Sequence, residues 1–239
     1  MNVLTIGNSF SQDATRYLHD VAKAQGKNIT VVNLCIGGCP LSLHYRNMLS
    51  DDKAYSLEFN GCGTGFKMSL SEALLSRDWD YISVQQVSHL SVNYDTYQPY
   101  LDSFADYIKE CCPKAKLLVH QTWAYEQGSD RLHISMKYNH RKDMLNDIVD
   151  SYSYAAKAID AYKIIPSGQM FDMLLDSGIE SVHRDTFHAS LGLGRYALAL
   201  LWLRALTGAD VSENNFSQFD TQITDEQIKI AKDCVMKII

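Results

Sequence analysis

The sequence lacks a long apolar run. No stretch of it approaches the roughly 18 consecutive apolar residues that a membrane span requires, so we expect no such span. It also lacks a basic segment followed by an apolar one at its start, because an apolar run typical of a strand begins almost at Met1. We therefore expect either a cytoplasmic protein or a secreted or periplasmic one whose signal peptide has been removed, and the sequence does not separate the two.

An excess of positive charge is also missing. The chain has 22 Lys and Arg against 28 Asp and Glu, which gives a formal net charge of −6. Nucleic-acid-binding proteins usually carry a clustered basic face. The densest basic stretch, Lys137–Lys142, is typical of a solvated helix face. The charge balance therefore argues against a nucleic-acid partner.

The cysteines show no paired Cys-x-x-Cys spacing, which is the pattern typical of structural zinc sites. We therefore expect buried or chemically idle thiols rather than disulfides or metal ligands. The six are Cys35, Cys39, Cys62, Cys111, Cys112 and Cys234.

Internal repeats, low-complexity tracts and linkers are absent as well. The 239 residues are 46% hydrophobic and 21% charged, which is ordinary for a globular protein. We expect one domain over residues 1–239, because α/β folds of this length commonly remain undivided.

Short apolar segments alternate with segments of helical periodicity. The apolar segments are rich in Val and Ile, as in strands buried on both faces, and they are Val3–Ile6, Thr30–Leu34, Tyr81–Gln85, Leu117–His120 and Tyr162–Ile165. The predicted helices are Asp13–Ala24, Ser69–Ser76, Tyr97–Cys111, His140–Ala158, Gln169–Asp176, Leu191–Leu206 and Asp225–Ile239. This alternation predicts an α/β protein with a parallel five-stranded sheet, right-handed crossovers and helices on both faces.

Residues Lys53–Lys67 interrupt the alternation. Alternating side chains lead there into the glycine-rich run Gly61–Gly65, which predicts a small β-hairpin laid over one end of the sheet. These glycines do not join a strand to a helix, so they do not indicate a phosphate-binding loop.

Polar residues and glycines follow the predicted strands. Because ligands bind beyond the carboxyl ends of parallel strands, we expect these positions to converge on one edge of the sheet. They are Ser9, Gly37-Gly38, Gln85–His89, Gln121–Tyr125 and Ser167.

The segment Gly7-Asn8-Ser9-Phe10-Ser11 directly follows the first apolar run. A strand-to-helix turn would expose the Ser9 hydroxyl, and the following helix would place N–H groups and positive dipole near a developing oxyanion. The alternative is that Ser9 or Ser11 caps a helix beginning near Asp13. Asp13 itself is expected to be a surface residue on that helix.

The segment Asp185-Thr186-Phe187-His188 places a carboxylate three residues before an imidazole. This spacing lets Asp185 hold and orient His188 as a general base. With Ser9, these are the parts of a nucleophilic hydrolase. Two alternatives are that Asp185 caps a turn beside a merely polar His188, or that His183, Asp185 and His188 bind zinc.

The chain resembles the SGNH (GDSL-type) hydrolases, which are serine esterases with a flavodoxin-like three-layer α/β/α sandwich. Gly7-Asn8-Ser9 matches the family block that carries the nucleophile, and Asp185 and His188 match its last block, Asp-x-x-His. Asn33–Gly38 fits the block that supplies an oxyanion glycine. The resemblance implies that Ser9, Asp185 and His188 are catalytic.

The resemblance also implies an oxyanion hole formed by the N–H groups of Ser9 and Gly38 and an asparagine after the third strand. The sequence departs from the family here, because Ser83–His89 replaces the usual Gly-x-Asn-Asp. His89 falls near the asparagine position. The amide of Gln85 is a second candidate donor, and its alternative role is that of a structural amide at a strand end.

Trp79-Asp80, Gln85 and Thr122–Tyr125 are similar to an uncharacterised bacterial branch of this superfamily that lies near carbohydrate esterases. In this branch Trp123 and Tyr125 would border the site. Either aromatic ring would stack on a sugar or roof the core.

The resemblance favours a serine esterase that removes short acyl groups, acetyl above all, from a carbohydrate without a metal or organic cofactor. A short acyl group also fits the lack of a long apolar lid. The alternatives are a non-catalytic carbohydrate-binding protein, a metal-dependent hydrolase, and a lysophospholipase or thioesterase.

Overall fold

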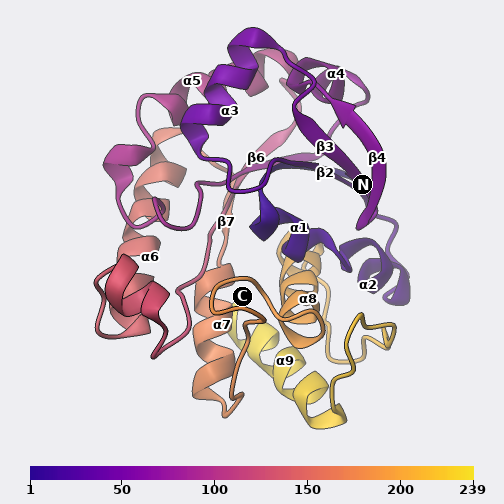
Figure 1. The fold of residues 1–239 in the computed structure, drawn as a ribbon. Coiled ribbons are helices and arrows are strands. Elements are labelled where there is room, and N and C mark those ends of the chain that lie inside the picture. Colours follow the sequence, from indigo (N-terminus) through magenta and orange to yellow (C-terminus); the bar gives the residue numbers. More distant parts are fainter.

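A seven-stranded sheet lies between two groups of helices in the computed structural model, which describes residues 1–239 (Figure 1). Across the sheet the strands are β4 (Cys62–Met68), β3 (Tyr55–Phe59), β2 (Thr30–Cys35), β1 (Asn2–Gly7), β5 (Tyr81–Val84), β6 (Lys116–His120) and β7 (Lys163–Ile165). The five strands from β2 to β7 are parallel, so the predicted parallel α/β arrangement is confirmed.

The hairpin is where the predicted five-stranded sheet is wrong. Strands β3 and β4 do not lie over one end of the sheet but extend its edge, and β3 pairs antiparallel with β2. Glu58 stands opposite Asn33 in this pairing, and its carboxylate accepts a hydrogen bond of 2.8 Å from the Asn33 amide. An unpaired β2 would leave its backbone N–H and C=O groups open, and the hairpin satisfies them.

The helices form one layer on each face of the sheet (Figure 1). One layer contains α1 (Ser9–Thr15), α2 (Leu18–Ala24), α7 (Ser167–Asp176), α8 (Leu193–Thr207) and α9 (Asp225–Ile238). The other contains α3 (Leu41–Ser50), α4 (Leu70–Leu75), α5 (Tyr100–Cys111) and α6 (Arg141–Ala158). Two short helical turns, Tyr94–Thr96 and Arg131–Ser135, lie in the loops before α5 and α6.

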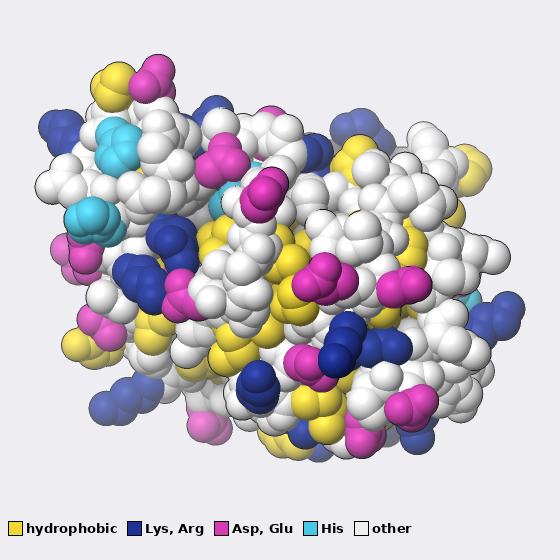
Figure 2. Space-filling model, turned by 90° about the horizontal axis from the view of Figure 1, so that it is seen from below, with side chains coloured by type: hydrophobic (Ala, Val, Ile, Leu, Met, Phe, Trp, Pro, Cys, Tyr) yellow, Lys and Arg dark blue, Asp and Glu magenta, His cyan; other side chains and the backbone are white.

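Helix α8 is the most deeply buried helix of the first layer. It is buried on nearly every side, as its apolar sequence predicts, and it packs against α1, α2, α7 and α9. None of the helices combines the length and apolar character needed to cross a bilayer. On the face seen from below, acidic and basic side chains are interspersed around apolar atoms, so this face carries no basic patch (Figure 2).

Two helix predictions differ from the structure. The predicted helix Asp13–Ala24 is two helices, and the first begins earlier, at Ser9, because the Asn8 side chain accepts a hydrogen bond of 3.0 Å from the N–H of Phe10. The N-cap of α1 is therefore Asn8 rather than Ser9 or Ser11.

Helix α3, which follows Pro40, was not predicted.

Two buried histidines predict acid sensitivity. Burial lowers the pKa of His44, on α3, and of His120, at the end of β6, to about 3 in each case. The unfolded chain binds a proton on each imidazole below about pH 6.5, whereas the folded chain does not until far lower pH, so acid favours unfolding. We expect the free energy of unfolding to fall by about 2 to 3 kcal/mol between pH 7.5 and 5.5, measured by urea titration.

The matched variant for this prediction is His44→Phe. The His44 imidazole stacks on the ring of Tyr55, with 5.6 Å between the ring centroids, and phenylalanine keeps that ring contact. The variant should lose about half of the pH dependence. An unchanged pH dependence of the free energy of unfolding would show that His44 does not contribute to it.

Candidate active site

Ser9 is the first residue of α1 and follows the carboxyl end of β1. Its hydroxyl is not used for capping, because Asn8 caps the helix. Gly7 permits the turn: a Cβ atom there would lie 2.7 Å from Oε1 of Gln85 and from Oγ of Ser11. The side chain of Ser9 is therefore free to face the loop that carries Asp185 and His188.

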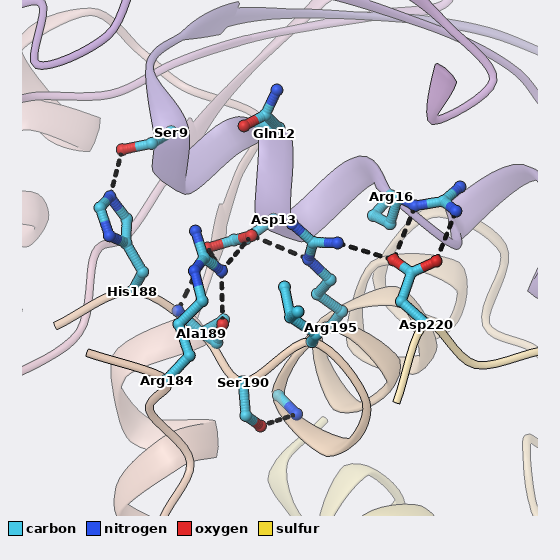
Figure 3. Close-up of polar contacts among 12 residues, drawn as sticks. Ser9, Gln12, Asp13, Arg16, Arg184, His188, Ala189, Ser190, Arg195 and Asp220 are labelled. Carbon is cyan, nitrogen blue, oxygen red and sulfur yellow. Dashed lines mark hydrogen bonds and ion pairs between the residues drawn. The ribbon is translucent and has the colours of Figure 1, made fainter. Parts of the chain in front are cut away.

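The imidazole of His188 lies between Ser9 and Asp185. Its Nε2 is 2.8 Å from the Ser9 hydroxyl, a contact that Figure 3 shows, and its Nδ1 is 2.7 Å from Oδ2 of Asp185. The other carboxylate oxygen of Asp185 accepts a hydrogen bond of 2.9 Å from the backbone N–H of His188. The three residues thus form a continuous hydrogen-bonded chain.

The negative charge on Asp185 determines which groups donate and which accept in this chain of hydrogen bonds. Burial alone would raise the pKa of Asp185, but the hydrogen bonds from the side chain and backbone of His188 outweigh it and hold the pKa below its ordinary value. The ionised carboxylate accepts the Nδ1 proton, so Nε2 is left to accept the hydroxyl proton of Ser9. The turn between them passes through Thr186 at a φ of 74°, a strained conformation for a β-branched residue.

Two backbone N–H groups that follow strands β1 and β2 donate to no other group of the protein. They belong to Ser9 itself and to Gly38, which follows β2 and has a φ of 63°, a conformation that favours glycine. The Asn8 side chain connects the two segments, since its amide donates a hydrogen bond of 3.1 Å to the carbonyl of Cys39. The predicted donors therefore lie on two loops that are tied together.

Gln85 points into the protein rather than toward an oxyanion. It is only 2% exposed; its amide nitrogen donates to Oδ1 of Asn8 at 2.9 Å, and its oxygen is 3.0 Å from Nδ1 of His120. The other ring nitrogen of His120 is 3.1 Å from the Ser167 hydroxyl. The oxyanion hypothesis for Gln85 is thus replaced by its structural alternative, because both ends of this amide hold buried groups.

His89 is not brought into the hydrogen-bonded chain. Its side chain is largely exposed, and desolvation of the covered part of the ring and the positive charge of Arg131 lower the pKa of His89. No hydrogen bond links its ring to Ser9 or His188, so its role as an oxyanion donor stays a prediction.

Trp123 and Tyr125 do not present a face to a substrate, because they are 0% and 1% exposed. Trp123 stacks on Phe10 at 4.1 Å and donates its indole N–H to the carbonyl of Phe187. The expectation that they bind a sugar is therefore wrong, and their core alternative holds. The half-buried aromatic ring at the site is that of Phe187, which lies 3.8 Å from the His188 ring and 3.8 Å from the Arg131 guanidinium.

The zinc alternative does not fit the geometry. Nε2 of His183 is 3.1 Å from the carbonyl of Ala124, so this nitrogen donates a hydrogen bond and offers no lone pair to a metal ion. No three His, Cys, Asp or Glu side chains are grouped so that they could hold a metal ion.

Asp13 was expected on the surface, but it is completely buried. Arg184, Arg195 and the backbone of Ala189 surround its carboxylate, as Figure 3 shows. Its place one helical turn after Ser9 was the only signal in the sequence that could have pointed to it.

Comparison with known proteins places the chain in a family. Residues 2–237 match the model of DUF4886, a domain of unknown function. The chain belongs to the DUF4886 family. The crystal structure of a DUF4886 family protein from Bacteroides uniformis is 37% identical to it, with a TM-score of 0.90, and the match covers 98% of this chain and 93% of that one. The sequence has no significant match among curated proteins.

More distant structures share the fold of this DUF4886 protein. A candidate SGNH hydrolase from Slackia heliotrinireducens is 20% identical with a TM-score of 0.60, and the match covers 86% of this chain and 98% of that one. Axe2, an acetylxylan esterase from Geobacillus stearothermophilus, is 17% identical with a TM-score of 0.58, over 86% and 94% of the two chains. The predicted resemblance to the SGNH fold is thereby confirmed.

Proposed function

We propose that this protein is a serine esterase that hydrolyses short-chain esters, acetyl esters of a carbohydrate above all. The observation that carries the proposal is the hydrogen-bonded chain Ser9–His188–Asp185 at the carboxyl edge of an SGNH-type sheet. Such a chain is the arrangement that activates a serine hydroxyl for attack on a carbonyl carbon.

In the first step, Nε2 of His188 accepts the Ser9 proton while the hydroxyl oxygen attacks the ester carbonyl. The negative charge that develops on the carbonyl oxygen is stabilised by the N–H groups of Ser9 and Gly38. The protonated His188 then donates its proton to the leaving alcohol, and an acyl group remains on Ser9.

In the second step, His188 removes a proton from water, and the water oxygen attacks the acyl carbon. The bond between this carbon and the Ser9 oxygen then breaks, His188 returns the proton to Ser9, and the acid is released. Asp185 acts in both steps, because its carboxylate keeps the Nδ1 proton in place and stabilises the imidazolium. This cycle requires no metal or organic cofactor.

The substrate class is proposed from two observations. Axe2, a neighbour in fold, is described as an acetylxylan esterase. In this chain, Phe187 lies beside His188 and Arg131 lies over the Phe187 ring, and this aromatic ring and guanidinium suit a polar, ring-shaped alcohol better than a lipid tail.

The test is a series of 4-nitrophenyl esters from acetate to octanoate, with EDTA present. We expect turnover to be fastest with acetate and to fall with chain length, and we expect a fluorophosphonate to abolish it. Acetate release from acetylated xylo-oligosaccharides would then define the alcohol.

Each rival gives a different result in this series. Rates that rise with chain length would favour a lysophospholipase or thioesterase. A protein that binds acetylated oligosaccharides but neither turns over esters nor reacts with the fluorophosphonate would be a binding protein.

A further inference from the structure

A buried carboxylate lies one helical turn after the proposed nucleophile. Asp13 is on α1, four residues beyond Ser9, and its side chain is fully enclosed. Oδ1 accepts hydrogen bonds from Nη1 of Arg184 at 2.8 Å and from Nε of Arg195 at 2.9 Å. Oδ2 accepts from Nη1 of Arg184 at 2.9 Å and from the backbone N–H of Ala189 at 3.1 Å.

The partners of Asp13 flank the proposed acid–base pair in the sequence. Arg184 immediately precedes Asp185, and Ala189 immediately follows His188. The loop is also closed at its base: the backbone N–H of Arg184 donates to the carbonyl of His188 at 3.0 Å, and Nη1 of Arg184 donates to the carbonyl of Ala189 at 2.6 Å. Asp13 therefore holds both ends of the turn that carries the proposed base.

Arg184 reaches both carboxylates of the site. Its Nε lies 4.0 Å from Oδ2 of Asp185, while its Nη1 binds Asp13. A buried carboxylate without its cations would be unstable, so Asp13 and Arg184 keep each other in one arrangement. Figure 3 shows Arg184 and Ala189 next to the Asp13 carboxylate, which comes from the helix that carries Ser9.

A second carboxylate, Asp220, completes the network but does not contact the loop. It lies near the surface, with a 26% exposed side chain, and binds Nη1 of Arg195 at 2.7 Å and two nitrogens of Arg16 at 2.9 and 2.6 Å. Asp220 therefore shares Arg195 with Asp13 but makes no hydrogen bond with residues 184–189.

We propose that Asp13 is a positioning residue, which sets the distance between the Ser9 hydroxyl and Nε2 of His188 by tying α1 to the loop of residues 184–189. The inference rests on the proposed esterase function. Because a misplacement of about 1 Å between reacting groups can cost about 100-fold in rate, a tie at this point acts on catalysis and not only on stability.

The test is Asp13→Asn, which keeps the shape of the side chain but removes the charge that holds the two arginines. We expect kcat for 4-nitrophenyl acetate to fall about 100-fold, with KM within a factor of about two. The rate is expressed per folded molecule, with the folded fraction taken from circular dichroism under the assay conditions. A role in stability alone would change the folded fraction but not this rate.

The matched control is Asp220→Asn, which disturbs Arg195 from its other side and should leave kcat within about three-fold of the wild type. Where Asp13→Asn does not fold, Arg184→Lys carries the test, because lysine keeps the charge but is one bond shorter than the reach of Nη1 and lacks the Nε–H group near Asp185; we expect about a 10-fold loss.

A kcat for Asp13→Asn or Arg184→Lys close to that of the wild type would overturn the positioning role while the esterase proposal stands. Wild-type protein without turnover would instead overturn the esterase proposal, and the positioning role with it.

Discussion

Ser9→Ala is expected to lower the rate of 4-nitrophenyl acetate hydrolysis by at least about 10⁴-fold. In a serine hydrolase the loss of the nucleophile removes the covalent route, and only the contribution of binding and the oxyanion site remains. The hydroxyl to be removed is the one that lies 2.8 Å from Nε2 of His188. Initial rates and mass spectrometry of the fluorophosphonate-treated protein, with the label expected on the Ser9 peptide, measure the effect.

A second serine on the same helix provides the control. The Ser11 hydroxyl is buried and donates to the carbonyl of Asn8, so it takes no part in the chain to His188. Ser11→Ala should retain activity within about 10-fold and still react with the fluorophosphonate. Equal rates for Ser9→Ala and the wild type would show that Ser9 is not the nucleophile.

His188→Gln is expected to cost about as much as Ser9→Ala, because without the imidazole the hydroxyl of Ser9 has no base to accept its proton. The two residues act as one unit, so their effects should not add. The double variant Ser9→Ala/His188→Gln should therefore be no slower than either single variant, within about three-fold. Steady-state rates of the three variants test this.

His183→Gln is the matched control for the imidazole. His183 lies five residues before His188, and its imidazole ring hydrogen-bonds only to the carbonyl of Ala124. We expect its replacement to leave most of the activity. Loss of activity in His183→Gln, together with inhibition by EDTA, would favour a metal-dependent mechanism instead.

The features that could be predicted from the sequence are those that depend on short segments. The apolar runs at Val3–Ile6 and Thr30–Leu34 place two strands within one residue of their observed ends. Because parallel strands end at one edge of a sheet, the strand ends also predicted that Ser9 and Gly38 would lie on one edge. The spacing of Asp185 and His188 required only one turn of the chain.

The features that could not be predicted depend on partners far away in the sequence. Asp13 meets Arg184 across 171 positions, and no local pattern indicates that a charged residue on α1 will be buried between two arginines. The sequence suggested Gln85 as an oxyanion donor because it stands at the carboxyl end of a strand, on the edge where the site was expected. Which way the amide points is decided by Asn8 and His120, 77 and 35 positions away.

The distance between Ser9 and His188 along the chain has a consequence for biosynthesis. The two residues are 179 positions apart and come from opposite ends of the sequence. A ribosome that has translated Ser9 must still make most of the protein before His188 is added. On the proposed mechanism, a chain that ends before His188 would carry Ser9 without its base and would not hydrolyse esters.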